Sequence, residues 1–209
     1  MGLFKPAWMN NDRETALSAV KKLTNQAGLA RVAKHSKHDD VRILAAEKLD
    51  DKPLAQTVYT EIAKNQRSDY RLLVAGRLDD TFLAQRVYTD IATDHEYNDD
   101  SRIEAANRLD NKDRAQKVYA EIAKNSNDFW LRLNTIKKLD DKSLAQTMYA
   151  ELAKAIMKYN SSMDRDMYDE KCEKVMEKLT DQAALADVAQ NAKSSYVGEL
   201  AQKKLAELS

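Results

Sequence analysis

The sequence predicts an all-α fold, a right-handed α-solenoid of antiparallel helix pairs, and three observations lead to it. A unit that reads VRILAAEKLDDKPLAQTVYTEIAK at 41–64 returns, with drift, at 70–93, 101–124 and 131–154. The leucine ahead of the turn in each unit recurs at intervals of 26 to 40 residues, which is typical of solenoid repeats. Only 4 Gly and 2 Pro occur in 209 residues, where average usage would give roughly 15 and roughly 10. Helices are therefore expected to fill the chain, and each is expected to bury its apolar face against its neighbours.

The N-terminal end of the array opens with a short irregular stretch. Residues 1–11 are expected to form a strap on the first helix, and 12–208 are expected to hold the helical repeats of a single domain. Asp12 and the two asparagines before it offer an N-cap for a helix that runs to Lys22. A short helix over 26–35 is expected to follow.

The central units each consist of two helices, which in the best-preserved unit cover 41–49 and 53–64. Asp39 and Asp40 are expected to cap the first helix, and Pro53 stands in the first turn of the second. The terminal units lack four residues that the central ones carry after Leu-Ala. Since four residues make about one helical turn, the apolar face keeps its phase while the helix lengthens. This periodicity indicates helix independently of composition.

The longest interval between the turn leucines lies between 139 and 179. The simplest explanation is a longer helix that reaches Tyr159, a turn at 160–163 and a further long helix from Asp164. The complete prediction is about 13 helices, arranged as six pairs plus an N-terminal capping helix.

Composition narrows the function classes. Hydrophobic residues make up 43%, so a core can form, and 34 basic residues cancel 34 acidic ones. No general attraction to nucleic acid or to a membrane follows from that balance. Cys172 is the single cysteine, so no intrachain disulfide is possible. No apolar run is long enough for a signal peptide or a membrane span, and a cytoplasmic monomer is expected.

Each central unit places an arginine in the middle of the apolar arc of its first helix, taking about 100° per residue. This position holds Arg42, Arg71, Arg102 and Arg132, and Asp40, Asp69 and Asp100 stand two residues ahead of the first three. A buried arginine must be paired, so a ladder of arginine–aspartate hydrogen bonds between neighbouring repeats is expected. Trp130 replaces the aspartate in the fourth unit. Catalytic or ligand-binding use of these arginines is the alternative.

The run from Asp40 to Leu49, aspartate followed by Val-Arg-x-x-Ala-Ala-x-x-Leu, resembles the second helix of HEAT repeats of the short bacterial type. The MGLF opening is also similar to that of bacterial HEAT-like proteins. The resemblance covers about 12–208 and implies that the helices of the VRILAAEKL type line a concave inner surface. The departures are Trp130, the 40-residue interval, and the end units, in which Ala16, Cys172 and Gly198 take the arginine position. The matching positions are structural, so the resemblance concerns architecture rather than function.

A row of basic residues lies on the outward arc of the inner helices. It consists of Lys22, Lys48, Arg77, Arg108, Lys138, Lys178 and Lys204. A cation in the last turn of a helix complements the helix dipole, which gives the row a structural role. Recognition of an acidic or phosphate-bearing partner is the alternative.

Aromatic and apolar residues at unusual positions complete the candidate surface. Leu44 and Leu73 fall on the outward arc, while Phe129 and Trp130 begin an inner helix where other units are polar. Phe82 stands on a polar side, and the recurring Tyr59, Tyr88, Tyr119 and Tyr149 are expected to pack between repeats. The predicted partner-binding surface is therefore Leu44, Lys48, Leu73, Arg77, Arg108, Phe129, Trp130 and Lys138. Coverage of these groups by neighbouring side chains remains open.

No constellation points to an enzyme. His35 and His38 have helix-like spacing beside two aspartates, but no third distant ligand cluster accompanies them. No glycine-rich phosphate loop, nucleophile with a histidine partner or catalytic carboxylate pair is recognisable. No metal, no cofactor and no catalytic residue is therefore predicted.

The function that these observations favour is a non-enzymatic scaffold that holds a protein or peptide partner on its concave face. Nucleic-acid binding is the second hypothesis, because HEAT-like DNA glycosylases use a basic concave face with tryptophans and an aspartate. Asp128 and Trp130 are faintly similar to that arrangement, while the zero net charge opposes it. The third hypothesis, a lyase acting on a tetrapyrrole, rests only on the resemblance.

Overall fold

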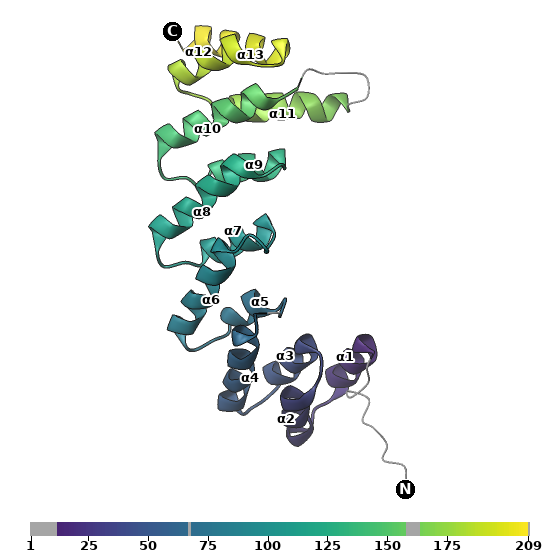
Figure 1. Cartoon of the computed structure of the whole chain (residues 1–209). Coiled ribbons are helices and arrows are strands. Elements are labelled where there is room, and N and C mark those ends of the chain that lie inside the picture. Colours follow the sequence, from purple (N-terminus) through teal and green to yellow (C-terminus); the bar gives the residue numbers. More distant parts are fainter. Residues whose placement is uncertain (1–11, 67, 158–163, 209) are drawn as a thin grey trace. The chain divides into compact units, whose positions relative to one another are not determined.

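The computed structural model describes residues 12–66, 68–157 and 164–208. Within those ranges the protein is all-α, with thirteen helices and no strand (Figure 1), which confirms the predicted class. The predicted strap at 1–11 and the predicted turn at 160–163 lie outside the described residues. The chain forms two compact units, Met1–Asp110 and Asn111–Ser209.

The first unit contains seven helices in which successive and alternate elements pack together. These are α1 (Arg13–Lys22), α2 (Gln26–His35), α3 (Asp39–Glu47), α4 (Lys52–Lys64), α5 (Arg71–Ala75), α6 (Thr81–Thr93) and α7 (Asp99–Asn107). Helix α4 contacts α3 and α5, and α6 contacts α5 and α7, while α1 packs on α3 and α2 on α4 (Figure 1). Each helix from α3 to α6 therefore contacts both the helix before it and the helix after it.

The second unit contains six helices. These are α8 (Lys112–Asn125), α9 (Phe129–Ile136), α10 (Lys142–Ala155), α11 (Arg165–Lys178), α12 (Gln182–Asn191) and α13 (Ser195–Glu207). Helix α10 contacts α9, α11 and α12, and α13 packs on α11 and α12. The long interval in the sequence is thus accommodated between α10 and α11.

The turn between the two helices of a pair is closed by a side-chain cap. The cap is an aspartate at four of these turns, and its side chain accepts a hydrogen bond from the backbone N–H of the residue three positions later: Asp51, Asp80, Asp141 and Asp181. Asn111 does the same at α8. Such a cap satisfies one of the free N–H groups of the helix and stabilises it by about 1 kcal/mol. The prediction that Asp39 and Asp40 cap α3 is wrong, because His38 is the N-cap residue and both aspartates lie in the first turn.

Two helices end earlier than the sequence pattern indicates. Helix α10 ends at Ala155 rather than Tyr159, because Ile156 adopts φ −62° and ψ 119°, which is extended backbone. Helix α5 has 5 residues and stops at Gly76, a residue that disfavours helix by about 1 kcal/mol relative to alanine. Residues at the end of α10 line a hollow, and α5 carries the exposed Leu73.

A glutamine near the start of each second helix connects its repeat to the next one. In α4, Gln56 donates from Nε2 to the carbonyl oxygen of Arg77 (2.8 Å) and accepts from the N–H of Asp79 (3.0 Å). The same two-way clamp is made by Gln26, Gln85, Gln116 and Gln146. It satisfies backbone groups that a helix end leaves free. The glutamine recurs in the sequence at the corresponding position of each central unit.

The core follows the apolar positions of the repeat. Tyr59, Tyr88, Tyr119 and Tyr149 are each buried to at least 94%, which confirms that they pack in the interior. Burial raises the pKa of the Tyr59, Tyr119 and Tyr149 phenols above the ordinary value. Two of the rings also carry a cation, since Arg108 lies 5.8 Å from the centroid of Tyr88 and Lys138 lies 5.7 Å from that of Tyr119.

Candidate functional site

The four repeat arginines share one backbone contact. In each case Nε donates to the carbonyl oxygen of an alanine at the end of the preceding helix, with distances of 3.0 Å for Arg42–Ala33, 3.0 Å for Arg71–Ala63, 3.2 Å for Arg102–Ala92 and 2.8 Å for Arg132–Ala123. Each arginine therefore completes the C-terminal end of its neighbour. Arg71 and Arg102 are 5% and 4% exposed, so the expectation that this position faces the core is confirmed for these two.

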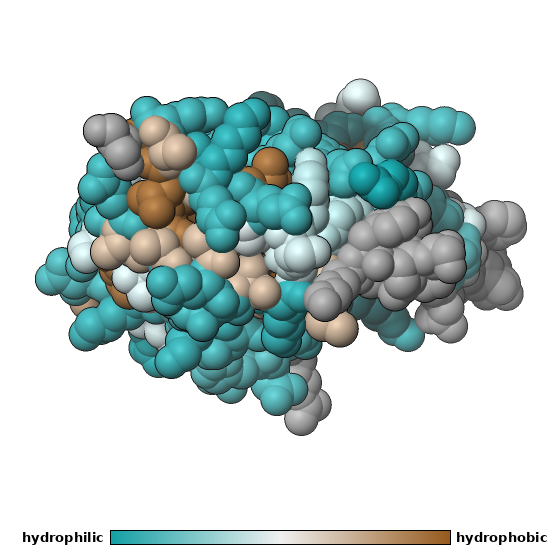
Figure 2. Space-filling model, turned by 90° about the horizontal axis from the view of Figure 1, so that it is seen from above, coloured by the Kyte–Doolittle hydropathy of each residue, from teal (hydrophilic) through white to brown (hydrophobic). Residues whose placement is uncertain are grey.

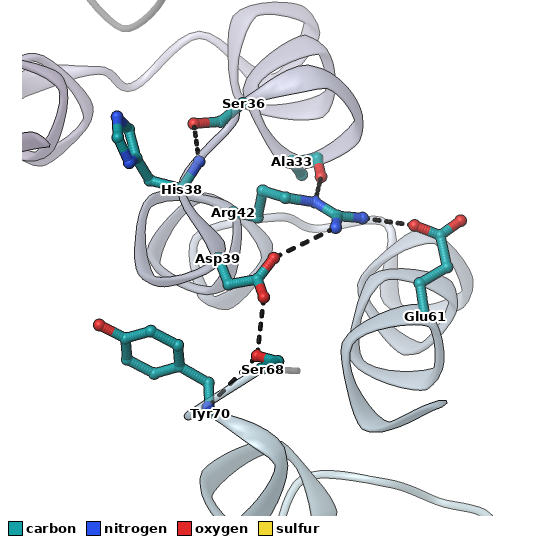
Figure 3. A network of polar contacts seen from close by, with 8 residues as sticks. All are labelled: Ala33, Ser36, His38, Asp39, Arg42, Glu61, Ser68 and Tyr70. Atoms are coloured by element: carbon teal, nitrogen blue, oxygen red, sulfur yellow. Dashed lines mark hydrogen bonds and ion pairs between the residues drawn. The ribbon is translucent and has the colours of Figure 1, made fainter. Parts of the chain in front are cut away.

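The acidic partners of the arginines differ from the predicted ones. Arg42 pairs with Asp39 (3.4 Å) and with Glu61, as Figure 3 shows. Arg71 pairs with Asp90 (3.1 Å) and also donates to the hydroxyl of Tyr97 (3.2 Å).

The position of the acids on the helix explains the difference. The structure pairs Arg102 with Asp99 at 3.2 Å rather than with the predicted Asp100. The prediction that Asp40, Asp69 and Asp100 pair with the arginines is wrong. Asp40 and Asp100 lie on the same helix as their arginines, and residues two apart on a helix do not face each other. Asp69 precedes α5, and Arg71 pairs with Asp90 instead. Asp40 instead forms an ion pair with Arg13 (2.6 Å).

A constant spacing in the sequence could have identified one set of partners. An acidic residue stands 19 positions after each repeat arginine, at Glu61, Asp90, Glu121 and Glu151. The ion pairs of Arg42 with Glu61 and of Arg71 with Asp90 follow this spacing. It belongs to neighbouring repeats rather than to one helix, so a reading of each helix alone does not find it.

The basic row is engaged in contacts within the chain. Lys48 donates to the carbonyl oxygens of Val20 and Lys21, both at 2.9 Å, and so completes the end of α1. Arg77 pairs with Glu47 at 2.6 Å and donates to the carbonyl oxygen of Leu73. Lys48 and Arg77 therefore each bind groups of a neighbouring helix, α1 and α3 respectively.

Arg108 and Lys138 have similar surroundings. Arg108 pairs with Glu104 at 2.6 Å, and both residues lie over the buried tyrosine rings named above. For these four members of the row, the contacts favour the structural role over recognition of an acidic or phosphate-bearing partner.

The apolar candidates of the first unit lie at different depths. Leu44 is half-buried in α3, whereas Leu73 in α5 is 42% exposed. Phe82 at the start of α6 is 80% exposed. In the face that Figure 2 shows, hydrophilic residues dominate and apolar side chains gather in small groups. Leu73 and Phe82 therefore both present apolar surface to solvent.

In the second unit, Phe129 and Trp130 contact each other at the start of α9. Their ring centroids lie 5.1 Å apart, with planes at 88°, and both residues are half-buried. The predicted exposure of this pair is therefore only partial. Phe129 stands three residues ahead of Arg132, the position that holds Asp39 and Asp99 relative to their arginines. A ring has thus replaced the acid that pairs with the arginine in α3 and α7.

An apolar hollow of about 400 Å³ opens beside this pair, among α9, α10 and α11, which lie next to one another in Figure 1. Its apolar lining consists of Phe129, Leu152, Ile156, Met157, Met167 and Tyr168. Met157 and Met167 are 60% and 50% exposed, so thioether side chains form part of its rim. The volume falls in the range of small ligand pockets, roughly 300–1,000 Å³.

Two cationic residues and one acidic residue line the hollow. Arg132 lines it and forms no ion pair with any described residue. Lys171 also lines it, with its ammonium group 5.6 Å from the centroid of the Phe129 ring. The carboxylate of Asp164 accepts from the N–H of Met167 (2.8 Å), where it caps α11. An apolar wall beside two cations is suited to a ligand that is both apolar and acidic.

Side chains that could hold a metal ion do not assemble in the parts of the chain that the structure describes. No set of three or more His, Cys, Asp or Glu side chains there has the arrangement of a metal site. Cys172 is fully buried, and burial raises the pKa of its thiol to about 11. None of the helices in the described ranges has the length and apolarity needed to cross a membrane.

Comparison with protein-family models, with curated proteins and with solved structures finds no match for this chain. The family resemblance and the function therefore have to be argued from the residues themselves.

Proposed function

We propose that this chain is a non-enzymatic scaffold that binds a protein or peptide partner, and that the hollow among α9, α10 and α11 is its principal docking point. The hollow itself carries the proposal, because it offers a preformed apolar cavity of about 400 Å³ with two exposed methionines at its rim. Methionine side chains adapt to differently shaped apolar partners. Of the surface predicted from sequence, Phe129 belongs to this hollow and Trp130 supports it.

The architecture we infer is a right-handed HEAT-like solenoid in a cytoplasmic monomer. Repetition supports it: the arginine-to-carbonyl bond and the glutamine clamp occur in both compact units, at corresponding positions of the repeat. Small-angle scattering of a solenoid should give an elongated particle of monomer mass. A compact sphere or a dimer would contradict this architecture.

Photocrosslinking tests the docking point. A benzoylphenylalanine at Met167 should trap a defined partner in extract from the native host, and excess unlabelled protein should compete with it. The matched control is the same group at Lys203, an exposed residue of α13. Identical adducts at both positions, or none at Met167, would contradict the proposal. Retention of the protein on DNA in a salt-dependent manner would favour the second hypothesis instead.

A further inference from the structure

The position of Arg132 in the hollow has a specific consequence for the chemistry of the partner. In α3, α5 and α7 the equivalent arginine is ion-paired through its terminal nitrogens. Arg132 keeps the shared Nε bond to Ala123 but has no ion pair among the described residues. Two changes account for this difference.

The first change is the replacement of the nearby acid. The residue three positions ahead is Phe129, which cannot accept an ion pair. The second concerns Glu151, which stands at the 19-residue spacing but is paired with Lys154 at 2.8 Å. Lys154 also pairs with Asp187 at 2.6 Å. Outside the described residues, at 1–11, 67, 158–163 and 209, the sequence contains no Asp or Glu. The chain therefore has no further acidic side chain to offer.

The environment makes an unpaired guanidinium unfavourable. Arg132 is half-buried and lies beside Leu152, Ile156 and Met157 in the hollow. Burial lowers the pKa of this arginine, and the charge of Glu151 opposes the shift only in part. A desolvated cation that lacks a counter-ion costs free energy, which an incoming carboxylate would recover through charge-assisted hydrogen bonds.

Charge at the rim points in the same direction. Lys171 adds a second cation, held 5.6 Å from the Phe129 ring centroid. Asp164, the acid among the lining residues, is engaged in capping α11. The hollow therefore presents an excess of positive charge next to an apolar wall, which selects an acidic partner by electrostatic complementarity.

We propose that the hollow accepts a segment of a partner protein in which a bulky apolar side chain stands next to a carboxylate, with Arg132 pairing with that carboxylate. This inference rests on the proposed function, since it specifies the partner of the same docking point. Arg132 forms the ion pair with the carboxylate, and Phe129, Met157 and Met167 contact the apolar side chain.

Four short peptides with blocked ends separate the two claims. They are Ac-Ser-Phe-Glu-Ser-NH2, its Gln and Lys versions at the third residue, and Ac-Ser-Ala-Glu-Ser-NH2. Binding is followed by the methyl signals of Met157 and Met167 in protein labelled at the methionine methyl carbons. The Glu peptide should bind about tenfold more tightly than the Gln peptide, the usual size of one charge-assisted hydrogen bond. The Lys and Ala peptides should bind more weakly than the Gln peptide.

Variants assign the effect to Arg132. Arg132→Met should abolish the preference for Glu over Gln, and Arg132→Lys should restore part of the preference. Arg114→Met, which removes the same charge from an exposed site on α8, should leave the preference intact. Circular dichroism at each step confirms that the variants are folded.

The outcomes distinguish the two claims. Equal affinity for the Glu and Gln peptides, with shifted methionine signals, would overturn the inference about the carboxylate and leave the docking point standing. Unshifted Met157 and Met167 signals with every peptide would overturn both. A Glu preference that survives Arg132→Met would also overturn the role of Arg132.

Discussion

Arg71 in the first unit and Arg132 in the second stand at the same position of the repeat, and their surroundings differ. Arg71 is 5% exposed and contacts Ala63, Asp90 and Tyr97. Among the described residues, the side chain of Arg132 keeps the hydrogen bond to Ala123 alone, beside an apolar hollow. One residue type at one position therefore holds repeats together where acids surround it. Where a ring has replaced the acid, the same residue lines an apolar hollow instead.

The largest expected effect tests the structural half of this comparison. Arg71→Ala should destabilise the protein by about 3–5 kcal/mol, because it leaves a partly buried acid and a carbonyl group without their partner. Arg132→Ala should cost only about 1 kcal/mol, the net contribution of one hydrogen bond. Urea unfolding followed by circular dichroism measures both. Equal shifts of the two midpoints would remove the distinction between the arginines.

The glutamine clamp should be equally important in both units. Gln56→Leu and Gln116→Leu each remove two hydrogen bonds to the backbone of the following turn. Each should lower the free energy of unfolding by about 1–2 kcal/mol. Gln56→Glu retains the acceptor and should cost about half as much. Amide hydrogen exchange at Asp79 and Asp140 provides a local readout. A loss of stability in only one of Gln56→Leu and Gln116→Leu would show that the clamp is not an equivalent feature of both units.

An acid restored to α9 should form an ion pair with Arg132, as Asp39 does with Arg42 in α3 and Asp99 with Arg102 in α7. Phe129→Asp places a carboxylate three residues ahead of Arg132, as Asp39 and Asp99 stand relative to their arginines. The variant should lose the preference for the Glu peptide, with a change in stability of no more than about 1 kcal/mol. Phe129→Leu is the control, which keeps the site apolar and should keep the preference. The comparison fails if Phe129→Asp binds the Glu peptide as the unaltered protein does.

Cys172 in α11 occupies the same repeat position, and its contribution to stability should depend on pH. Its pKa is raised to about 11 from an ordinary value of 9.0, because burial disfavours the thiolate. The neutral thiol is required in the folded state, so its contribution to stability is complete below pH 9 and is lost as the pH rises from about 9 to about 11. Urea midpoints of the protein and of Cys172→Ala should therefore converge over this range. Parallel curves would contradict it.

Much of the fold follows from the periodicity of the sequence. The repeating leucine, the helical phase of the apolar positions and the scarcity of glycine together predict alternating helices, and the structure has them. The errors fall at helix ends. Ile156 ends α10 and Gly76 ends α5 early, and such local conformations depend on packing that periodicity does not describe.

The candidate site was predicted only in part, for two physical reasons. The pairing of arginines was assigned to aspartates two residues away, whereas partners lie three residues before or 19 residues after. The unusual residues Phe129 and Trp130 were recognised from the break in the repeat. The hollow beside them also needs Met157, Met167 and Tyr168, which come from segments far along the chain, and their convergence is a property of tertiary structure.

The most direct test of the different roles of Arg71 and Arg132 is nitrogen-15 NMR of their guanidinium groups. An ion pair slows rotation of the terminal NH2 groups, so Arg71 should show separate, slowly exchanging signals for its two terminal nitrogens at low temperature. Arg132 should show one averaged signal in the free protein, and it should separate only when the Glu peptide is added. Slow rotation at Arg132 without peptide, or no change on adding it, would contradict the account.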